Sequence, residues 1–467
     1  MAKPLIIFGV SKPNVYSFAN IIGALENNQR IMDSYDIVVL RKSAFKRKFY
    51  ITIQDDAKGL EIRDRPFIVM PYSVFTTQLK KFTKAIKTYM ENLRSTNPNI
   101  ITIVGGWHAT GDPESILQIG ADFTILGESE FIFSQLLLLI HQQYGNYRNN
   151  LNPQNQGFQD FKGALKEYIG SKIQLGELNH LATSTDDQLL IKDNITPANR
   201  PEIAVNLDDY CPYSEKFRVF SPIEISRGCP FRCKFCQTGN YWNKMRHASV
   251  DQIVKWVERA VEIKYDRVWF LSPNSFAYGA KNGVGTNPEK VRELLSKTYE
   301  IKGLDEIYFG SFPSEVRPEY ITVEILDAAK PYISNDYFSI GAQTASDDLL
   351  KKINRSHEFS DVVRGVDLIL DYGYGVDVDF IFGLPGETAK DRELTLEYFE
   401  SILHDNKKIR IHTHTFMPLP GTPFWHEPVG KIDRETEEIV GKLATKGKAF
   451  GQYVKQSKVK KKMLKRK

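Results

Sequence analysis

Three cysteines lie close together in the segment 226–236, and their spacing is the strongest chemical signal in the sequence. Cys229, Cys233 and Cys236 follow a C-x3-C-x2-C pattern. Three thiolates on one loop can hold three irons of a four-iron cluster and leave the fourth iron without a protein ligand. A structural zinc ion is the alternative, but it normally closes with four ligands, and Cys211 is the one cysteine left to complete the set. The pattern therefore predicts a 4Fe-4S cluster with one iron open to substrate.

The composition is that of a folded protein with two or three domains. The chain has 467 residues, of which 42% are hydrophobic and 25% charged. No apolar run approaches the roughly 20 residues that a membrane span needs, and no export signal is visible. Clustered cysteines indicate metal ligands in a reducing compartment, so we expect a cytoplasmic protein with no membrane partner. Much of the net charge of +5 sits in a basic tail at 455–467, which predicts an exposed end, with nucleic acid an unlikely partner.

The first part of the chain alternates β-rich runs with helical patterns. The runs lie at 5–10, 35–40, 66–72, 100–104 and 122–126. This alternation predicts an α/β fold, a doubly wound (Rossmann-like, flavodoxin-like) domain over residues 1–145, because parallel strands need helical crossovers. Residues 146–219 are polar, with one weak helical stretch at 161–169, and predict a connector.

A second βα series begins at residue 223. Further strands are expected at 267–271, 306–311, 337–342, 375–382 and 409–416. Amphipathic helices are expected at 250–263, 288–299, 361–370 and 391–403. About six βα units predict a partial (β/α)6 TIM-like barrel over 220–424, with the cysteine loop after its first strand, where barrel active sites lie. Residues 425–467 predict a C-terminal helical segment and the basic tail.

The cysteine loop resembles the signature of radical S-adenosylmethionine (SAM) enzymes, including the aromatic residue before the last cysteine. The resemblance implies that SAM chelates the open iron and that its reductive cleavage yields a 5′-deoxyadenosyl radical. It continues through the motifs at 272–274, 310–317, 341–343, 379–387 and 416–423, although 272–274 is Ser-Pro-Asn where the superfamily often has Gly-Gly-Glu. The residues that it assigns to SAM are Phe235, Ser272, Asn274, Ser314, Glu315, Arg317 and Gln343. A plain ion pair between Glu315 and Arg317 is the alternative to their contacts with the ribose and carboxylate of SAM.

Glycine-rich turns follow two of the strands in the first half, at 104–113 and 127–130. Placed ahead of a radical SAM barrel, they resemble the cobalamin-binding radical SAM enzymes, in which the corrin lies between the two domains. The D-x-H-x-x-G pattern is missing, so we expect no histidine ligand on the lower face of cobalt. The residues assigned to cobalamin are Tyr72, Ser73, Val74, Gly105, Gly106, His108, Gly127 and Glu128. For His108 a purely structural role is the alternative.

The resemblance implies a reaction but no particular catalytic side chain. Most enzymes with this pair of domains transfer a methyl group from methylcobalamin to an unactivated carbon, and this sequence looks closest to archaeal protein C-methyltransferases. The implied substrate is a peptide or protein, possibly the glutamine Cα of methyl-coenzyme M reductase, with a ferredoxin or flavodoxin-like reductant. A cyclase or mutase acting on a small molecule, or a non-catalytic metal-binding protein, is the alternative. The residues that could line a substrate cavity, or simply pack in the core, are Tyr241, Trp242, His412 and His414.

Overall fold

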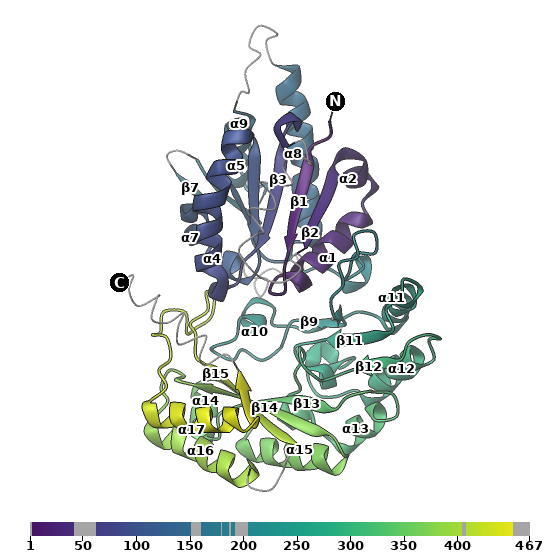
Figure 1. Cartoon of the computed structure of the whole chain (residues 1–467), viewed down its shortest axis with the longest axis vertical. Helices are drawn as coiled ribbons and strands as arrows, with labels where there is room; N and C mark the ends of the chain where they lie inside the picture. The colour runs from purple at the N-terminus through teal and green to yellow at the C-terminus, as the bar shows by residue number, and fades with distance from the viewer. Residues whose placement is uncertain are drawn as a thin grey trace. The chain divides into compact units, whose positions relative to one another are not determined.

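The computed structural model describes most of the chain and divides it into two compact units (Figure 1). The described residues are 2–41, 62–150, 160–178, 180–185, 188–191, 204–403 and 408–451. One unit comprises Met1–Val205 and Asp209–Ser221, and the other comprises Asn206–Asp208 and Pro222–Lys467. The basic tail at 455–467 lies outside the described residues. Within the described part, none of the helices combines the length and the apolar character that a membrane crossing requires.

The first unit contains a sheet in the order β2-β1-β3-β4-β5-β6-β7. Its first five strands are parallel and are β1 (Leu5–Val10), β2 (Asp36–Arg41), β3 (Ile68–Ser73), β4 (Ile100–Gly105) and β5 (Phe123–Ile125). The order 2-1-3-4-5 is that of flavodoxin-like folds, so the prediction of a doubly wound domain is confirmed. The central strands β1, β3 and β4 are almost entirely apolar, which fits a sheet covered by helices on both faces.

Alternate residues of each strand serve the two apolar cores of this unit. On β1, Ile6 and Phe8 pack in one core and Leu5 and Ile7 in the other. The first core is completed by α1 (Val15–Glu26), α2 (Gln29–Ser34), α8 (Glu130–Asn149) and α9 (Phe161–Gln174). The second is completed by α4 (Leu79–Lys84), α5 (Glu91–Thr96), α6 (Trp107–Gly111) and α7 (Pro113–Ile119). The strands are therefore held between two helical layers with their carboxyl ends at one edge.

Much of the predicted connector belongs to the first unit. Helix α9 packs in the core, and β6 (Leu181–Ser184) and β7 (Leu189–Ile191) extend the sheet antiparallel beyond β5. The Thr183 hydroxyl donates a hydrogen bond to the Asp122 carbonyl at 2.8 Å. Because these two strands are short and partly polar, their alternation is too weak to separate them from a loop. The prediction of a connector over the whole of 146–219 therefore differs from the structure.

The second unit is a partial barrel of parallel strands taken in chain order. They are β8 (Ile223–Glu224), β11 (Arg267–Leu271), β12 (Glu306–Tyr308), β13 (Tyr337–Gln343), β14 (Gly375–Phe382), β15 (Ile409–Thr415) and β16 (Ala449–Gly451). A bridge between Val316 and Ile340 connects the β12 side to β13. The partial barrel is confirmed. Strand β16 is a further parallel strand that the prediction missed, because three residues carry no periodicity.

Helices follow the barrel strands, and the four that were predicted are found with at most small shifts of their ends. They are α11 (Val250–Glu262), α12 (Pro288–Tyr299), α13 (Val323–Ala329), α14 (Asp347–Lys352), α15 (Phe359–Asp371), α16 (Ala389–Leu403) and α17 (Arg434–Thr445). The cysteine loop leaves the short strand β9 (Ser226–Arg227), passes through α10 (Gln237–Tyr241) and returns in β10 (Arg246–His247), which pairs with β9. The pairing of β9 with β10 thus brings the two ends of the cysteine loop together at the start of the barrel.

Candidate active site

Backbone hydrogen bonds hold the cysteine loop in one shape. The Cys229 amide donates to the Trp242 carbonyl at 2.9 Å, and the Cys236 amide donates to the Cys233 carbonyl at 3.0 Å. The Asn240 side-chain amide donates to the carbonyls of both Cys233 and Cys236, at 3.0 and 2.6 Å. Each cysteine backbone is therefore held before any cluster is bound, which pre-organises the three thiols.

Two glycines permit this shape. Gly228 has a φ of 92°, and a Cβ there would lie 2.2 Å from the Lys244 carbonyl oxygen. At Gly239 a Cβ would lie 1.8 Å from the Phe231 carbonyl oxygen. Because the obstructing atoms are backbone, any side chain at Gly239 would push the loop open.

The surroundings of the thiols fit a metal cluster. Burial raises the pKa of the Cys229 thiol to about 11, and the neighbouring Cys236 raises it further. Burial and the neighbouring Cys233 likewise raise the pKa of the Cys236 thiol. Both raised pKa values oppose ionisation of Cys229 and Cys236 in the loop alone, and a cationic cluster would favour the thiolate forms by compensating their charge. The loop thus has the chemistry of a cluster site.

The thiols do not surround one small ion. In the part of the chain that the structure describes, ligand atoms of three residues come within 4.8 Å of one another at Asp379, His412 and His414, and not at the three cysteines. Sulfurs bound to a single zinc at about 2.3 Å would lie closer together than that. Thiolates that each bind their own iron of a cluster lie further apart. Cys211 belongs to the other unit, where its carbonyl faces Gly23.

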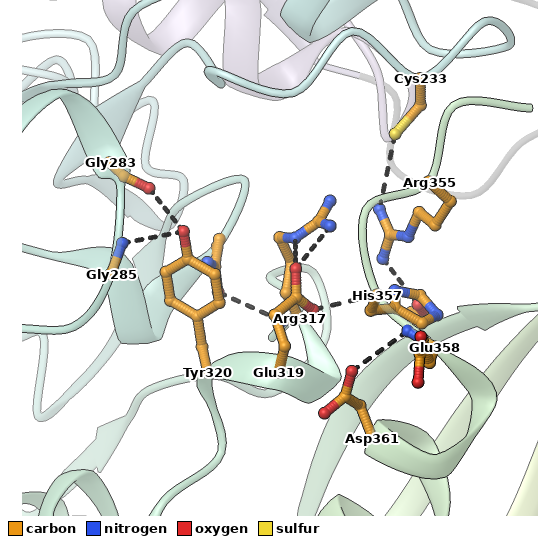
Figure 2. A network of polar contacts seen from close by, with 12 residues as sticks. Cys233, Gly283, Gly285, Arg317, Glu319, Tyr320, Arg355, His357, Glu358 and Asp361 are labelled. Atoms are coloured by element: carbon orange, nitrogen blue, oxygen red, sulfur yellow. Dashed lines mark hydrogen bonds and ion pairs between the residues drawn. The ribbon is translucent and has the colours of Figure 1, made fainter. Parts of the chain in front are cut away.

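Arg355 stands beside the cysteine loop (Figure 2). Its Nη1 lies 3.9 Å from the Cys233 sulfur, and its Nη2 donates to the Gly341 carbonyl at 2.6 Å. A guanidinium next to a thiolate lowers the negative charge that the cluster loop must carry. The site therefore receives a positive charge from the loop after α14.

Arg317 is the most enclosed charged group of the site. It is 3% exposed, and its guanidinium lies over the Phe231 ring at 3.7 Å. Its Nε donates to Glu319 at 2.6 Å, and its backbone amide donates to the Asn274 Oδ1 at 3.2 Å. Arg317 therefore pairs with Glu319, and the alternative of a simple Glu315–Arg317 ion pair is wrong (Figure 2).

Several buried donors around Arg317 lack hydrogen-bond partners in the described part of the protein. They are Nη1 of Arg317, Nδ2 of Asn274 and the Ser275 hydroxyl. Buried polar atoms are nearly always hydrogen-bonded, so a group of unpartnered donors indicates a ligand that would accept from them. A carboxylate that accepts from Nη1 of Arg317 and from the neighbouring donors is such a ligand, which fits the carboxylate of SAM.

A second polar group gathers over Gly341. A Cβ there would lie 2.8 Å from both Arg355 Nη2 and Gln343 Nε2, and 3.0 Å from Glu315 Oε2. Glu315 is accessible to solvent, although protein atoms lie close around its carboxyl group. Burial and the nearby Asp379 carboxylate raise the pKa of Glu315 to about 8. The structure thus brings Glu315 and Gln343 together on the barrel, next to Arg355.

Ser272 and Ser314 have roles inside the fold. The Ser314 hydroxyl donates to the Phe270 carbonyl at 2.7 Å and accepts from the Ser272 amide at 3.0 Å. The Ser272 hydroxyl accepts from the Asn274 amide at 3.3 Å. These bonds tie the end of β11 to the segment that carries Glu315 and Arg317. The carbonyls of 272–274 remain the groups by which this segment would meet the amino group of SAM.

Three aromatic residues near the cysteine loop were predicted as possible contacts of SAM or substrate, and in the structure they pack against the protein. Phe235 packs against an apolar cluster that includes Leu349 and Phe424. The Tyr241 hydroxyl donates to the Pro420 carbonyl at 2.6 Å, and Trp242 is 8% exposed beside it. They therefore join the cysteine loop to α14 and to the segment that follows β15.

His412 and His414 lie on the same face of β15, as predicted. His412 Nδ1 is 2.6 Å from Asp379 Oδ1, and the two imidazole rings are 4.2 Å apart. Burial alone would lower the pKa of His412, but the hydrogen bond to Asp379 and its charge raise it overall. Burial and the neighbouring His412 lower the pKa of His414 to about 4. The pKa values of the two histidines are therefore shifted in opposite directions.

In the first unit, the turns after β3 and β4 are joined to each other. The Val74 amide donates to the Gly105 carbonyl at 3.0 Å, and the His108 amide donates to the Val74 carbonyl at 3.1 Å. Gly106 has a φ of 98°, and a Cβ there would lie 3.0 Å from the Val74 nitrogen and from the Ser73 hydroxyl. Small residues thus leave backbone accessible at the carboxyl edge, where sheets of this order bind ligands. This edge fits a large planar cofactor.

Three of the residues assigned to cobalamin have partners inside the fold. His108 is 1% exposed, with Nδ1 at 3.0 Å from Thr76 Oγ1 and Nε2 at 3.2 Å from Ser115 Oγ. The Glu128 carboxylate accepts from the Val205 amide at 2.6 Å, and the Tyr72 hydroxyl donates to the sulfur of Met90 at 3.3 Å. For His108 the structural alternative describes what is seen. Gly127, with a φ of 85°, keeps its backbone amide on Thr110 at 3.1 Å.

Sequence reasoning missed five residues of the site. They are Phe231, Glu319, Arg355, His357 and Asp379. Phe231 and Asp379 lie inside motifs that were recognised, so their positions were marked but their roles were not. Arg355 and His357 follow α14 with no pattern around them, and only the folded chain brings them to the cysteine loop.

Two families match the chain, each over one unit's core. Residues 223–399 match the radical SAM superfamily, and residues 56–137 match the B12 binding domain. The first match contains the cysteine loop, Arg317 and Asp379. The second contains the turns after β3, β4 and β5.

Curated relatives cover about half of the chain. A threonylcarbamoyladenosine tRNA methylthiotransferase, MtaB, of Thermotoga maritima is 27% identical over 274 residues, which are 56% of this chain and 60% of the relative. A putative methylthiotransferase of Methanocaldococcus jannaschii is 30% identical over 260 residues, 55% of each chain. The chain thus spans a little over half the length of the curated relatives that it matches.

Solved structures share the fold of the whole chain. The radical SAM methyltransferase TsrM from Kitasatospora setae, with cobalamin and a [4Fe-4S] cluster bound, has a TM-score of 0.64 at 14% identity and covers 92% of this chain and 78% of its own. The cobalamin-dependent radical enzyme OxsB has a TM-score of 0.59 at 14% identity and covers 85% of this chain and 52% of its own. These likenesses show the fold.

The two family matches define the cofactors. A radical SAM domain implies a 4Fe-4S cluster and SAM, and a B12-binding domain implies cobalamin. The cysteine loop, the unpartnered donors around Arg317 and the glycine turns of the first unit fit these groups. The chain therefore carries a B12-binding domain over residues 56–137, followed by a radical SAM domain over residues 223–399.

Proposed function

We propose that the protein is a cobalamin-dependent radical SAM methyltransferase that methylates an unactivated carbon of a peptide or protein. The observation that carries the proposal is the order of the two domains, a B12-binding domain ahead of a radical SAM domain with three thiols on its loop. When bound, these cofactors supply a 5′-deoxyadenosyl radical that removes hydrogen and a methyl group that replaces it. A ferredoxin or flavodoxin-like protein in the cytoplasm would supply electrons.

The protein's own residues bind and orient the reactants. Cys229, Cys233 and Cys236 would hold the cluster, and Arg355 would offset its negative charge. Arg317, held flat against Phe231, would orient the carboxylate of SAM. The face of β14 and β15 that carries Asp379 and His412 is polar, which suits a substrate with amide groups better than an apolar one.

The substrate that we put forward is a glutamine residue, methylated at Cα, as in methyl-coenzyme M reductase. Hydrogen on such a carbon is not acidic enough for ordinary methyl transfer, so a radical route is needed. Phe312, which is 67% exposed, and Phe450, which is 39% exposed, flank His412 and give the polar face an apolar rim for a peptide chain.

The test follows the hydrogen that leaves the substrate. The holoenzyme, reconstituted without oxygen with cluster and cobalamin, is given SAM, a reductant and a synthetic peptide that carries a glutamine deuterated at Cα. We expect a methylated peptide, 5′-deoxyadenosine that has gained deuterium, and S-adenosylhomocysteine. A matched peptide with deuterium only on the glutamine side chain should give unlabelled 5′-deoxyadenosine.

Cysteine variants supply the control within the protein. Cys233→Ala should lose the cluster and all turnover, whereas Cys211→Ala removes a buried cysteine of the other unit and should keep both. Turnover by the Cys233→Ala variant would contradict the proposal. A wild-type protein that binds the cluster but fails to bind cobalamin would also contradict it. A rearranged or cyclised product without added carbon would favour a cyclase or mutase.

One observation favours a second candidate, transfer of a methylthio group to tRNA. The curated relatives that match residues of this chain at 27–30% identity are named as methylthiotransferases, and the T. maritima relative as one that acts on tRNA. The same reconstituted enzyme would be incubated with tRNA, SAM, the reductant and inorganic sulfide, and a nuclease digest of the tRNA would then contain a methylthiolated nucleoside. Methylation of the peptide without any change in tRNA decides for the first proposal.

A further inference from the structure

The inner faces of β14 and β15 carry polar residues where parallel barrels usually carry branched apolar ones. The register pairs Asp377 with Arg410, Asp379 with His412, and Ile381 with His414. The opposite face packs on α16, with Phe380 and Phe399 in ring contact at 4.9 Å. Barrel interiors are normally filled by Val, Ile and Leu, so this polar face needs an explanation.

Part of the polar face forms a simple ion pair. The guanidinium of Arg410 donates to both carboxylate oxygens of Asp377, at 2.7 and 2.8 Å, and lies 3.7 Å from the Tyr337 ring centre. Both groups of this pair are satisfied. The next layer along the strands differs, because its two histidines and one carboxylate face each other without an arginine.

In that layer, one ligand atom from each of Asp379, His412 and His414 lies within 4.8 Å of the other two. His412 Nδ1 is 2.6 Å from Asp379 Oδ1. Among the described residues, His414 has a ring contact with His412 but no hydrogen-bond partner. The half-buried imidazole of His414 therefore has ring nitrogens that no described residue uses, next to the Asp379–His412 pair.

The surroundings suit bound metal. Phe450 of β16 stacks on the His412 ring at 4.6 Å and 13°, which holds the imidazole in place. The Glu315 carboxyl group lies near Asp379, and outer carboxyl groups commonly accompany ligating ones. Two histidines and one carboxylate leave positions open for a substrate oxygen and are the donor set of catalytic zinc and of non-haem ferrous iron.

We propose that Asp379, His412 and His414 bind a divalent transition metal ion, zinc or ferrous iron, separately from the cluster. The ion would present open coordination positions on the side of Glu315 and would hold a carbonyl oxygen of the substrate. The site stands on the geometry of β14 and β15 alone. It does not require the methyl-transfer reaction, so either proposal can fail without the other.

The experiment measures metal rather than turnover. Holoenzyme without an affinity tag is analysed for iron, sulfide and zinc, and is then titrated with Zn²⁺ against a competing chelator. We expect one tight equivalent of Zn²⁺ beyond the cluster iron. His414→Gln and Asp379→Asn should each weaken Zn²⁺ binding roughly 100-fold or more, since even outer partners of ligands change metal affinity by 10–100-fold.

Matched variants and a spectroscopic probe keep the result interpretable. His426→Gln removes an exposed histidine of the same unit and should leave Zn²⁺ binding unchanged. Cluster iron and sulfide should stay at the wild-type level in all three variants, which shows that they fold. Co²⁺ in place of Zn²⁺ should give visible absorbance bands that His414→Gln abolishes. The proposal would be overturned if the wild type bound no Zn²⁺ beyond the cluster iron, or if His414→Gln and Asp379→Asn bound Zn²⁺ as tightly as the wild type. Weaker substrate binding by these variants would not rescue it.

Discussion

Arg317 shows how a single side chain can be prepared for a ligand. Its Nε is used by Glu319 and its flat face by Phe231, so the guanidinium cannot rotate. The remaining Nη1 is buried without a partner in the described structure. A lysine could supply the charge but neither the stacking nor the second donor.

We therefore predict that Arg317→Lys weakens SAM binding by about 10-fold to 100-fold, because a hydrogen bond to a charged group contributes about 1.5–3 kcal/mol. Equilibrium dialysis of SAM with the cluster-loaded enzyme measures this. Arg267→Lys, a change on the exposed start of β11, is the control and should bind SAM as the wild type does. Equal affinity in both variants would remove Arg317 from the SAM site.

At this scale the sequence predicted the chemistry of the cluster but not all of its neighbours. Cys229, Cys233 and Cys236 are recognisable because their spacing is local. Arg355 and Cys233 are 122 residues apart in the sequence, and local sequence patterns cannot predict such a contact. His108 was assigned to a ligand because it follows glycines, yet both of its ring nitrogens have protein partners.

At the scale of elements, two glycines of the first unit have different structural roles. Gly106 ends β4 with a positive φ against the turn after β3, whereas Gly145 lies in helix α8 with no atom within 4 Å of a Cβ. Substitution by alanine should therefore have opposite effects at the two positions.

We predict that Gly106→Ala destabilises the first unit by about 1–2 kcal/mol, because alanine is strained at positive φ and its methyl group meets Val74. Gly145→Ala should stabilise it by about 0.5–1 kcal/mol, since alanine favours a helix. Urea unfolding of the full chain measures both changes. Cobalamin affinity should fall only in Gly106→Ala; a loss in both would mean that the turn plays no special part.

The long, regular elements were predictable and the short ones were not. Strands β11 and β14 and helix α12 have the predicted bounds, because each carries a full apolar period. Strands β6, β7 and β16 have three or four residues each and are held by their neighbours in the sheet, not by their own pattern. Tertiary pairing therefore decided what local sequence could not.

At the scale of the whole molecule, buried histidines make stability depend on pH. His357 is 3% exposed, and neither ring nitrogen has a hydrogen-bond partner in the described part of the chain. Burial and the nearby charges of Arg355 and Arg317 lower its pKa to about 2. In the unfolded chain the same group takes up a proton near pH 6.5. The unfolded state therefore gains protons first, and stability falls as the pH drops below about 6.5.

We predict that His357→Leu flattens this dependence by up to about 1.4 kcal/mol per pH unit between about pH 6 and 4, because the variant has no such proton to take up. Anaerobic urea unfolding at several pH values measures the slope. His426→Leu, on an exposed segment, should leave the slope as in the wild type. A wild-type slope retained by His357→Leu would assign the acid sensitivity to other groups.

The order of domains was readable from the sequence because each domain has its own repeating layout. The place where the chain passes from one unit to the other was not, since residues 206–208 and 209–221 are assigned to different units. Their assignment depends on contacts such as Ser249 with Asp208 and Gly23 with Tyr213, which join distant parts of the chain.

The hydrogen bond between Glu128 and Val205 changes how mutagenesis of the corrin crevice should be interpreted. Glu128 lies in the turn after β5, and its hydrogen bond to Val205 fixes the segment that leads toward the radical SAM domain. Replacing it with alanine would release that stretch as well as alter the crevice, so a lost activity would be ambiguous. Glutamine keeps an acceptor for the Val205 amide, and the difference between the two replacements separates anchorage from recognition of the cofactor.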